Sequence, residues 1–307
     1  MYRIALFGYS GSGKTFLFRA ITGKQDDVYD PFKPNVGVGI YKDRNLSVIT
    51  ETHKARKVVY PEFEFYDFKG FPAGTGFPDN YFRNFAGFDL TACVVNNFAD
   101  TARADEEASS LLMELVFYDA ERAGRILQSR QEGAAEGPST AQAEVIKKGL
   151  KLLEKEKPLN QLGEDERKML LGMELLTVGP VIFCFNGDRA QPSLESPWCI
   201  YRNTGREDDP ESLYRLIIRQ LSLMTFYTVK GDIARGWLIP SLYTARQAAG
   251  SVHKDMEKGF VKAAVVNMKD FAQAGSWQAA KNAGGLKFLG PDAHLNDGDI
   301  VEFYFTR

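Results

Sequence analysis

Short apolar runs and amphipathic stretches alternate along the N-terminal two thirds of the chain. The apolar run Arg3–Phe7 predicts a strand, and Thr15–Thr22, with apolar side chains at helical spacing, predicts a helix. Val58–Tyr66 predicts a second strand, and Val36–Tyr41 an edge strand. Ala92–Val95 has the uninterrupted apolar character of a buried parallel strand. This order of elements indicates an α/β domain.

The middle of the chain predicts a pair of long helices. Asp105–Gln131 carries apolar residues at helical spacing and opens with acidic side chains, which stabilise a helix N-terminus. After a break at residues 133–139, Ser139 and Gln142 form a capping-box pattern that starts a second helix, which reaches Lys157. We expect a helical hairpin that projects from the parent domain.

Beyond the hairpin the pattern returns to the α/β type and then changes. Glu164–Leu176 predicts a helix and Val178–Phe185 the last clear strand of the domain. A further helix is expected from Asp209, as N-cap, through Leu223. After Leu223, short alternating runs separated by turns predict a second, α+β domain. The predicted divisions are 1–103 and 161–223 for the first domain, 104–160 for the hairpin and 224–307 for the last domain.

The segment between the first strand and the first helix fits the pattern G-x-x-x-x-G-K-[ST]. Its glycines let backbone N–H groups face a β-phosphate, and the helix N-terminus adds partial positive charge. Lys14 would bring a full charge to the phosphates and Thr15 a hydroxyl for Mg²⁺. The predicted nucleotide-binding residues of this loop are Gly8, Ser10, Gly11, Ser12, Gly13, Lys14, Thr15 and Phe16.

A second motif, Asp67-Phe68-Lys69-Gly70, closes the strand that follows about fifty residues later. Asp67 would hold the hydration shell of the metal, and the Gly70 N–H would meet the γ-phosphate. Lys14, Asp67 and Gly70 are thus the predicted catalytic residues, and Thr15 and Asp67 the predicted metal-binding ones. Phe71 follows where a glutamine that orients water is often found, and a phenyl ring cannot do so.

Asn186-Gly187-Asp188 ends the last strand, where a sequence that reads guanine would be expected. Asn186 can hydrogen-bond a base or a loop backbone, and Asp188 stands one residue earlier than a guanine-reading carboxylate. A plain turn explains the sequence equally well. We include Asn186 and Asp188 among the predicted nucleotide-binding residues and leave the choice between ATP and GTP open.

Composition excludes several classes of protein. The formal net charge of −2 gives no global reason to expect nucleic acid, and no DNA partner is predicted. No apolar run is long enough for a membrane span or a signal peptide, so we expect a cytosolic protein. Cys93, Cys184 and Cys199 are odd in number and lie in apolar surroundings, which favours reduced thiols.

A run of lysines marks the second hairpin helix and the residues after it. These lysines alternate with Glu154 and Glu156. A solvated helix face is the simpler explanation, and contact with RNA or a ribosome is the alternative. The lysines concerned are Lys147, Lys148, Lys151, Lys155 and Lys157.

Several of these stretches resemble the YchF or Obg-like ATPase family. They are the glycine-rich loop, residues 34–38 and 57–59, the Asp67–Gly70 motif and, most specifically, residues 245–260 and 297–301. The resemblance implies a P-loop NTPase domain, an inserted helical hairpin and a C-terminal β-grasp domain of the TGS type. It also implies a cytosolic monomer that hydrolyses ATP in preference to GTP and binds ribosomes. A hydrophobic residue at the position of Phe71 is itself a family feature.

The chain also departs from the family pattern. Gly11 replaces the asparagine that helps to hold potassium, and Lys33 stands where the family has a cysteine and threonine. The histidine proposed to serve hydrolysis has no counterpart between Asn96 and Asp105, and the region after Asn186 is about thirty residues shorter than in typical members. Two hypotheses follow: a slow nucleoside triphosphatase acting as a switch, and a degenerate module that works through its TGS-like and helical surfaces.

Overall fold

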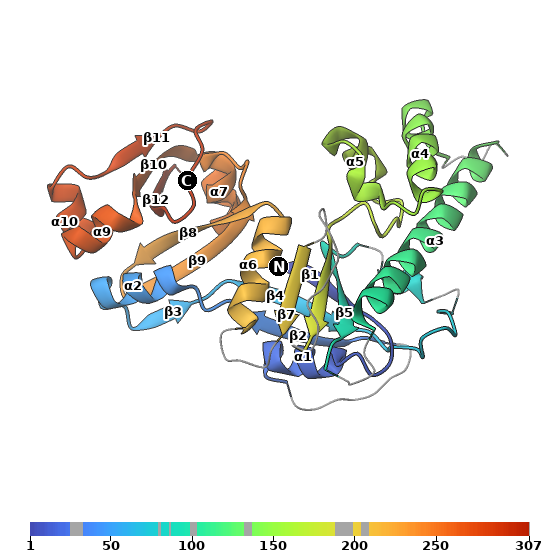
Figure 1. Cartoon of the computed structure of the whole chain (residues 1–307). Helices are drawn as coiled ribbons and strands as arrows, with labels where there is room; N and C mark the ends of the chain where they lie inside the picture. The colour runs from blue at the N-terminus through green and yellow to red at the C-terminus, as the bar shows by residue number, and fades with distance from the viewer. Residues whose placement is uncertain are drawn as a thin grey trace. The chain divides into compact units, whose positions relative to one another are not determined.

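A computed structural model describes residues 1–24, 33–78, 81–85, 87–98, 103–131, 137–187, 199–203 and 209–306 (Figure 1). The chain divides into two compact units. The first contains Met1–Gly39 and Phe63–Leu216, and the second contains Ile40–Glu62 and Ile217–Arg307. Within the described ranges, no helix has the length and apolar character needed to cross a bilayer.

The first unit is built on a six-stranded sheet with the order β2-β4-β1-β5-β6-β7. Strand β1 pairs in parallel with β4 and β5, and β5–β6 and β6–β7 are also parallel. The carboxyl ends of these strands therefore meet at one edge of the sheet. The strands are β1 (Tyr2–Phe7), β2 (Asn35–Ile40), β4 (Glu62–Asp67), β5 (Leu90–Asn96), β6 (Val181–Asn186) and β7 (Cys199–Asn203).

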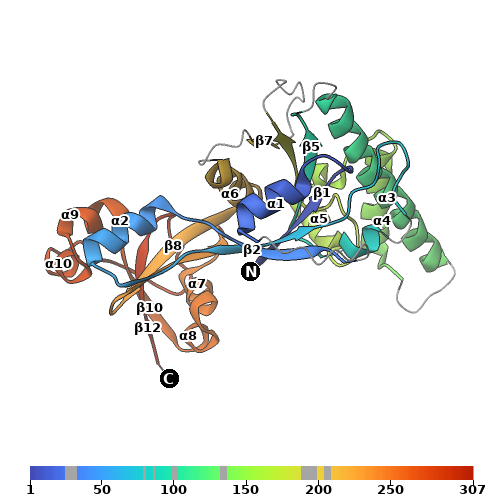
Figure 2. The same ribbon diagram turned by 90° about the horizontal axis from the view of Figure 1, so that it is seen from below.

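Helices cover both faces of this sheet (Figure 2). On one face, Tyr214 of α6 (Asp209–Gln220) stacks on Phe63 with ring centroids 5.7 Å apart, and α1 (Lys14–Thr22) lies on the same side. The other face packs against α3 (Ala104–Gln131) and η1 (Phe82–Phe85) in one apolar cluster. Because side chains alternate between the two faces of a strand, Phe7 of β1 lies in this apolar cluster.

The helical hairpin consists of α3 and α4 (Thr140–Leu153), followed by η2 (Leu159–Gln161) and α5 (Glu164–Leu170). The capping box is confirmed, because the Ser139 and Gln142 side chains each accept a backbone N–H of the other residue. The prediction of a helix over Glu164–Leu176 is wrong after Leu170, where turns follow. Residues 171–176 instead form turns that lead the chain back to α3.

A buried carboxylate joins the return segment to α3. Asp119 is fully buried and accepts the N–H groups of Leu176 (2.7 Å) and Thr177 (2.8 Å) and the Thr177 hydroxyl (2.5 Å). Burial raises the pKa of the Asp119 carboxyl to about 6, while these three hydrogen bonds act to lower it. The hairpin is thereby anchored to the parent domain through a polar contact inside its apolar core.

The second unit is a six-stranded sheet with the order β11-β10-β12-β8-β9-β3. Helix α7 packs into one apolar cluster of this sheet, with α8 beside α7 and β12, and α2, α9 and α10 pack with the other cluster. The strands are β3 (Lys57–Val59), β8 (Leu223–Lys230), β9 (Ile233–Pro240), β10 (Phe260–Val266), β11 (Lys287–Leu289) and β12 (Ile300–Phe305). The helices are α2 (Arg44–His53), α7 (Ala245–Val252), α8 (Lys254–Lys258), α9 (Met268–Ala274) and α10 (Trp277–Asn282).

The single strand predicted over Val58–Tyr66 is wrong. The structure has β3 and β4 in different sheets, separated by Tyr60 and Pro61, and β3 pairs in parallel with β9. Proline has no N–H for a sheet ladder, so a break at Pro61 is physically expected. Residues 40–62 thus contribute a helix and a strand to the second unit, for which the sequence pattern gave no signal.

The cysteines agree with the expectation as far as they are described. Cys93 and Cys184 are buried free thiols, and burial raises the pKa of both. The side chain of Cys199 lies outside the described residues.

Candidate functional site

The glycine-rich loop turns at the carboxyl edge of the first sheet, between β1 and α1. Gly11 and Gly13 have φ of +82° and +83°, the left-handed region that glycine adopts without strain. The first N–H groups of a helix have no intrahelical acceptor. At the start of α1 no capping side chain takes that place, because the N-cap residue is Gly13. These amides, together with the helix dipole, suit an anion.

Lys14 is buried at the base of this loop, with 6% of its surface exposed. Its ammonium donates to the carbonyls of Gly8 (2.8 Å) and Tyr9 (2.9 Å). Burial lowers the pKa of Lys14 to about 8, and the negative charges of Asp67 and Glu107 act in the opposite direction. A polyphosphate beside this amine would stabilise its charged form further.

Thr15 and Asp67 come together from opposite sides of the site. The Thr15 hydroxyl donates to Asp67 Oδ2 at 2.8 Å, and Asp67 is buried at the end of β4. A hydroxyl and one carboxylate are hard oxygen donors, which suit Mg²⁺ when phosphates and waters complete its shell. No cluster of three or more His, Cys, Asp or Glu side chains able to hold a metal occurs in the described ranges. The donor set therefore fits a metal that arrives with the phosphates.

Gly70 lies directly against the loop. A Cβ at this position would be 2.5 Å from Lys14 Nζ and 2.7 Å from Ser10 N. The next residue, Phe71, accepts a hydrogen bond from Ser10 N–H (2.8 Å) through its carbonyl. Its ring packs against Phe77 and Tyr81, with centroids 5.6 and 5.4 Å apart. The Phe71 side chain belongs to this aromatic cluster and does not line the phosphate pocket.

A cavity of about 330 Å³ opens above these groups. Among its lining residues are the predicted Ser10, Gly11, Gly13, Lys14, Thr15, Phe16, Asp67 and Gly70. Gly8 and Ser12, also in the loop, are not among the lining residues: Gly8 approaches the Val94 carbonyl so closely that a Cβ would be 2.4 Å from it, and Ser12 is buried. Sequence reasoning missed Lys33, Asn35, Phe68 and Lys69 in the lining. Two of them had a signal in the sequence: Lys69 lies within the Asp67–Gly70 motif, and Lys33 directly precedes residues 34–38, which resemble the family.

Asn186 supports the loop from behind. It is buried, and its Nδ2 donates to the Ser12 carbonyl at 3.1 Å. The fully buried Asn97, another residue that the sequence analysis missed, donates its Nδ2 to the Gly187 carbonyl (3.1 Å). Of the two uses considered for Asn186, the backbone contact is the one present; Asp188 lies outside the described residues.

Glu107 is an acidic group close to the loop that the sequence analysis also overlooked. Its carboxylate accepts the N–H of Asn96 (3.1 Å), at the carboxyl end of β5. Burial raises the pKa of Glu107, while the Asn96 N–H and the charge of Lys14 lower it. Glu107 thus contributes negative charge near the buried lysine without lining the cavity.

Comparison with known proteins agrees with this architecture. Residues 223–306 match the family YchF-GTPase_C, described as a protein of unknown function (DUF933). The ribosome-binding ATPase YchF of Pasteurella multocida is 28% identical, and that of Escherichia coli O157:H7 is 27% identical; the matches cover 99% of this chain and 99% of each relative. Over almost its whole length the chain is thus similar to proteins of the YchF family. The structure of the Schizosaccharomyces pombe YchF GTPase shares this fold, with a TM-score of 0.78 at 21% identity over 99% of this chain and 97% of that one.

The match to this solved structure confirms the fold class predicted from the sequence. That fold class combines a P-loop α/β domain, a helical insertion and a C-terminal α+β domain in one chain.

Proposed function

We propose that this chain binds a magnesium-nucleoside triphosphate, ATP or GTP, and hydrolyses it slowly as a switch. The observation that carries the proposal is the buried Lys14 ammonium beneath a loop of left-handed glycines, facing a cavity that also contains Thr15 and Asp67. Relatives named ribosome-binding ATPases match almost the full length of the chain and support the same activity.

Each group would have a distinct task in this mechanism. The loop amides and Lys14 would bind the β-phosphate, and Gly70 would bring its N–H toward the terminal phosphate. Thr15 and Asp67 would hold Mg²⁺, which supplies charge stabilisation to the phosphates. With Phe71 packed into an aromatic cluster, no glutamine orients the attacking water at this position. One missing transition-state group typically costs about 3 kcal/mol, or about a hundredfold in rate, so we expect slow turnover.

Titration of the purified chain with Mg-ATP and Mg-GTP tests the proposal. We expect saturable binding of at least one of them, loss of that binding in excess EDTA, and phosphate release in a single-turnover assay. No binding of either triphosphate would contradict the proposal. Binding with phosphate release no faster than that of a Lys14→Ala variant would favour the non-hydrolysing module instead.

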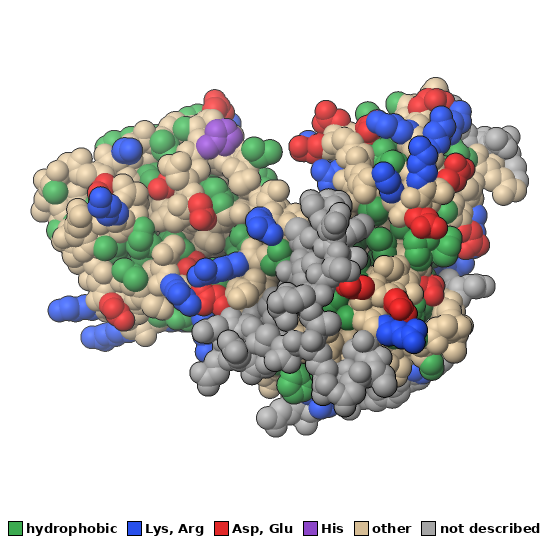
Figure 3. Space-filling model, in the orientation of Figure 1, with side chains coloured by type: hydrophobic (Ala, Val, Ile, Leu, Met, Phe, Trp, Pro, Cys, Tyr) green, Lys and Arg blue, Asp and Glu red, His purple; other side chains and the backbone are tan. Residues whose placement is uncertain are grey.

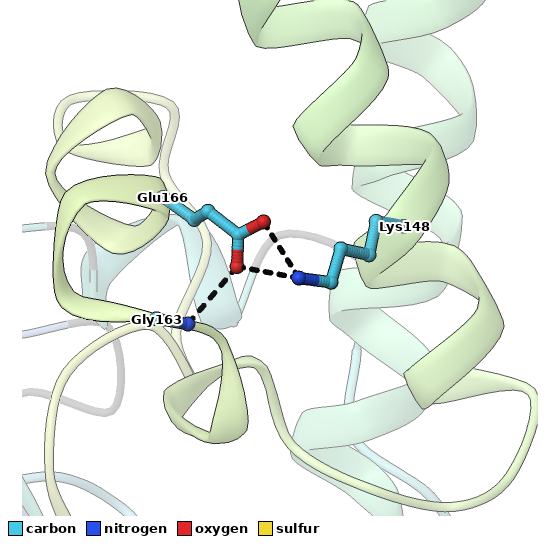
Figure 4. Close-up of polar contacts among 3 residues, drawn as sticks. All are labelled: Lys148, Gly163 and Glu166. Carbon is cyan, nitrogen blue, oxygen red and sulfur yellow. Dashed lines mark hydrogen bonds and ion pairs between the residues drawn. The ribbon is translucent and has the colours of Figure 1, made fainter.

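A ribosome contact is the second part of the proposal, and the lysine run is its candidate surface. Figure 3 shows Lys and Arg gathered over the helical insertion, among acidic side chains. Lys147 pairs with Glu144 (2.8 Å) and Lys148 with Glu166 (2.7 Å), whose carboxylate also accepts the Gly163 N–H at 3.0 Å (Figure 4). These two lysines already have partners within the hairpin.

Lys151, Lys155 and Lys157 differ from them. All three are exposed, and no ion pair joins them to any residue in the described ranges. Exposed ammonium groups of this kind bind RNA phosphates with a strong dependence on salt. The lysine end, defined as Lys151 in the last turn of α4 together with Lys155 and Lys157 after the helix, is therefore the part of the run best suited to an RNA contact.

Changing all three residues of the lysine end to glutamine should weaken co-sedimentation with ribosomes about tenfold at moderate salt. The slope of log affinity against log salt should fall by about 2 to 3, because three phosphate contacts are lost. The control is the double variant Lys147→Gln, Lys148→Gln, whose effect should be smaller because these lysines are ion-paired. Sedimentation that does not depend on salt, or equal loss in both variants, would contradict this surface.

A further inference from the structure

The phosphate cavity holds more positive charge than the glycine-rich loop requires. Its lining includes Lys33 and Lys69 in addition to Lys14, whereas Asp67 is its one carboxylate among the described residues. The lysines come from three separate segments: the residue two positions before β2, the Asp67–Gly70 motif and the start of α1. The cavity is therefore strongly cationic, and the charge surrounds it from more than one side.

The three ammonium groups are not equivalent. Lys14 is buried, and its hydrogen bonds to Gly8 and Tyr9 hold it at the floor of the loop. Lys33 is exposed, and Lys69 is half-buried. The Lys69 carbonyl accepts the Tyr81 hydroxyl at 2.7 Å, and its ammonium lies 5.4 Å from the centroid of the Phe71 ring. The backbone of Lys69 is thus fixed by the aromatic cluster, and Lys69 is among the residues that line the cavity.

The position of the metal ligands indicates which phosphate these two lysines would face. Thr15 and Asp67 would hold the metal that accompanies the phosphates, and Gly70, at the end of the same motif as Asp67, would bring its N–H toward the terminal phosphate. The terminal phosphate would therefore lie on the Asp67 side of the cavity. Lys69 follows Asp67 by two residues and lines that same cavity. A magnesium-triphosphate carries about one more negative charge than the corresponding diphosphate, and this extra charge is located on the terminal group.

We propose that Lys33 and Lys69 form a clamp for the terminal phosphate, so that the site prefers nucleoside triphosphates to diphosphates and stabilises charge during hydrolysis. This inference rests on the proposed function. In that reaction a water oxygen bonds to the γ-phosphorus while the bond from phosphorus to the β–γ bridging oxygen breaks, giving nucleoside diphosphate and inorganic phosphate. The ammonium groups would stabilise the equatorial oxygens as their charge redistributes.

This clamp gives the site a source of charge stabilisation that does not depend on Phe71. A glutamine acts by orienting water, and its absence is not repaired by a lysine. A lysine near the terminal phosphate acts on charge instead, as an arginine finger does when a chain supplies it in cis. The site would thus bind triphosphate selectively and still turn over slowly.

The test compares Lys33→Met and Lys69→Met with wild type and with Lys42→Met, an exposed lysine outside the cavity lining. Binding of Mg²⁺ with the β,γ-imido analogue of ATP and of Mg-ADP is measured for each, with thermal denaturation to confirm folding. We expect each cavity variant to lose about five- to tenfold in affinity for the imido analogue and less than twofold for Mg-ADP. Single-turnover hydrolysis of Mg-ATP should fall about tenfold or more, and Lys→Arg at the same position should restore most of it.

The outcomes separate this inference from the proposed function. If wild type binds the imido analogue and both cavity variants match it in affinity and in hydrolysis, the clamp is wrong while triphosphate binding stands. Equal losses for triphosphate and diphosphate would also overturn the clamp, because the lysines would then serve overall charge rather than the terminal phosphate. If wild type binds neither nucleotide, the proposed function and the clamp fail together.

Discussion

Replacing Lys14 with alanine should reduce binding of a labelled ATP analogue below detection, a loss of at least about a hundredfold, or about 3 kcal/mol. Its ammonium is buried under the glycine-rich loop and bonded to two loop carbonyls, so its removal takes the full charge out of the cavity and frees the loop. Equilibrium dialysis or fluorescence titration with Mg²⁺ present measures the effect.

The control for this variant is Lys42→Ala, which removes one exposed positive charge elsewhere in the chain. It should bind the analogue as wild type does. Thermal denaturation checks that the Lys14→Ala variant is folded, because the change leaves the buried Asp67 carboxylate without the positive charge of Lys14. Unchanged analogue binding in the folded variant would remove the phosphate mechanism altogether.

Replacing Gly70 with alanine should weaken triphosphate binding more than tenfold and slow hydrolysis about a hundredfold. The new Cβ would lie 2.5 Å from Lys14 Nζ and 2.7 Å from the Ser10 nitrogen and the Tyr9 carbonyl carbon. The lysine head could move, but the two backbone atoms belong to the loop itself, so the loop must shift. Affinity for the imido analogue and single-turnover phosphate release measure the outcome.

Gly124→Ala in α3 is the matched control for this change, since a Cβ there would meet nothing within 4 Å. It should leave binding and hydrolysis unchanged and stabilise the helix by up to about 1 kcal/mol. If Gly70→Ala and Gly124→Ala both retain wild-type affinity and rate, close packing of Gly70 against the loop has no part in the activity.

The parts of the molecule that the sequence predicted well are those encoded over short distances. The loop, its helix and the capping box at Ser139 each depend on neighbours within a few residues. The Asp67–Gly70 motif could be placed because parallel strands bring their carboxyl ends to one edge of the sheet. Local motifs of this kind carry their own geometry, and the structure reproduces it.

The missed features depend on contacts between distant residues. Strand β3 forms because it pairs with β9 at Ile233, and the residues around Lys57 do not indicate in the sequence that this partner exists. Asn186 turned out to contact the Ser12 carbonyl, a choice that the strand-end sequence alone left open. Phe71 was predicted to be unable to orient water, but its place among Phe77 and Tyr81 emerges only when the aromatic segment is folded.

The crossing of residues 40–62 into the second unit has a consequence for synthesis of the chain. Leu46 and Ile49 are fully buried in a cluster with Tyr227 and Phe271, which lie more than 170 residues further along. At about 5–20 residues per second, a nascent chain would wait roughly ten seconds or more for those partners to be made. During that interval the apolar face of this helix has no native surface to cover it. A newly made chain would therefore depend on temporary protection of these side chains that the finished protein no longer needs.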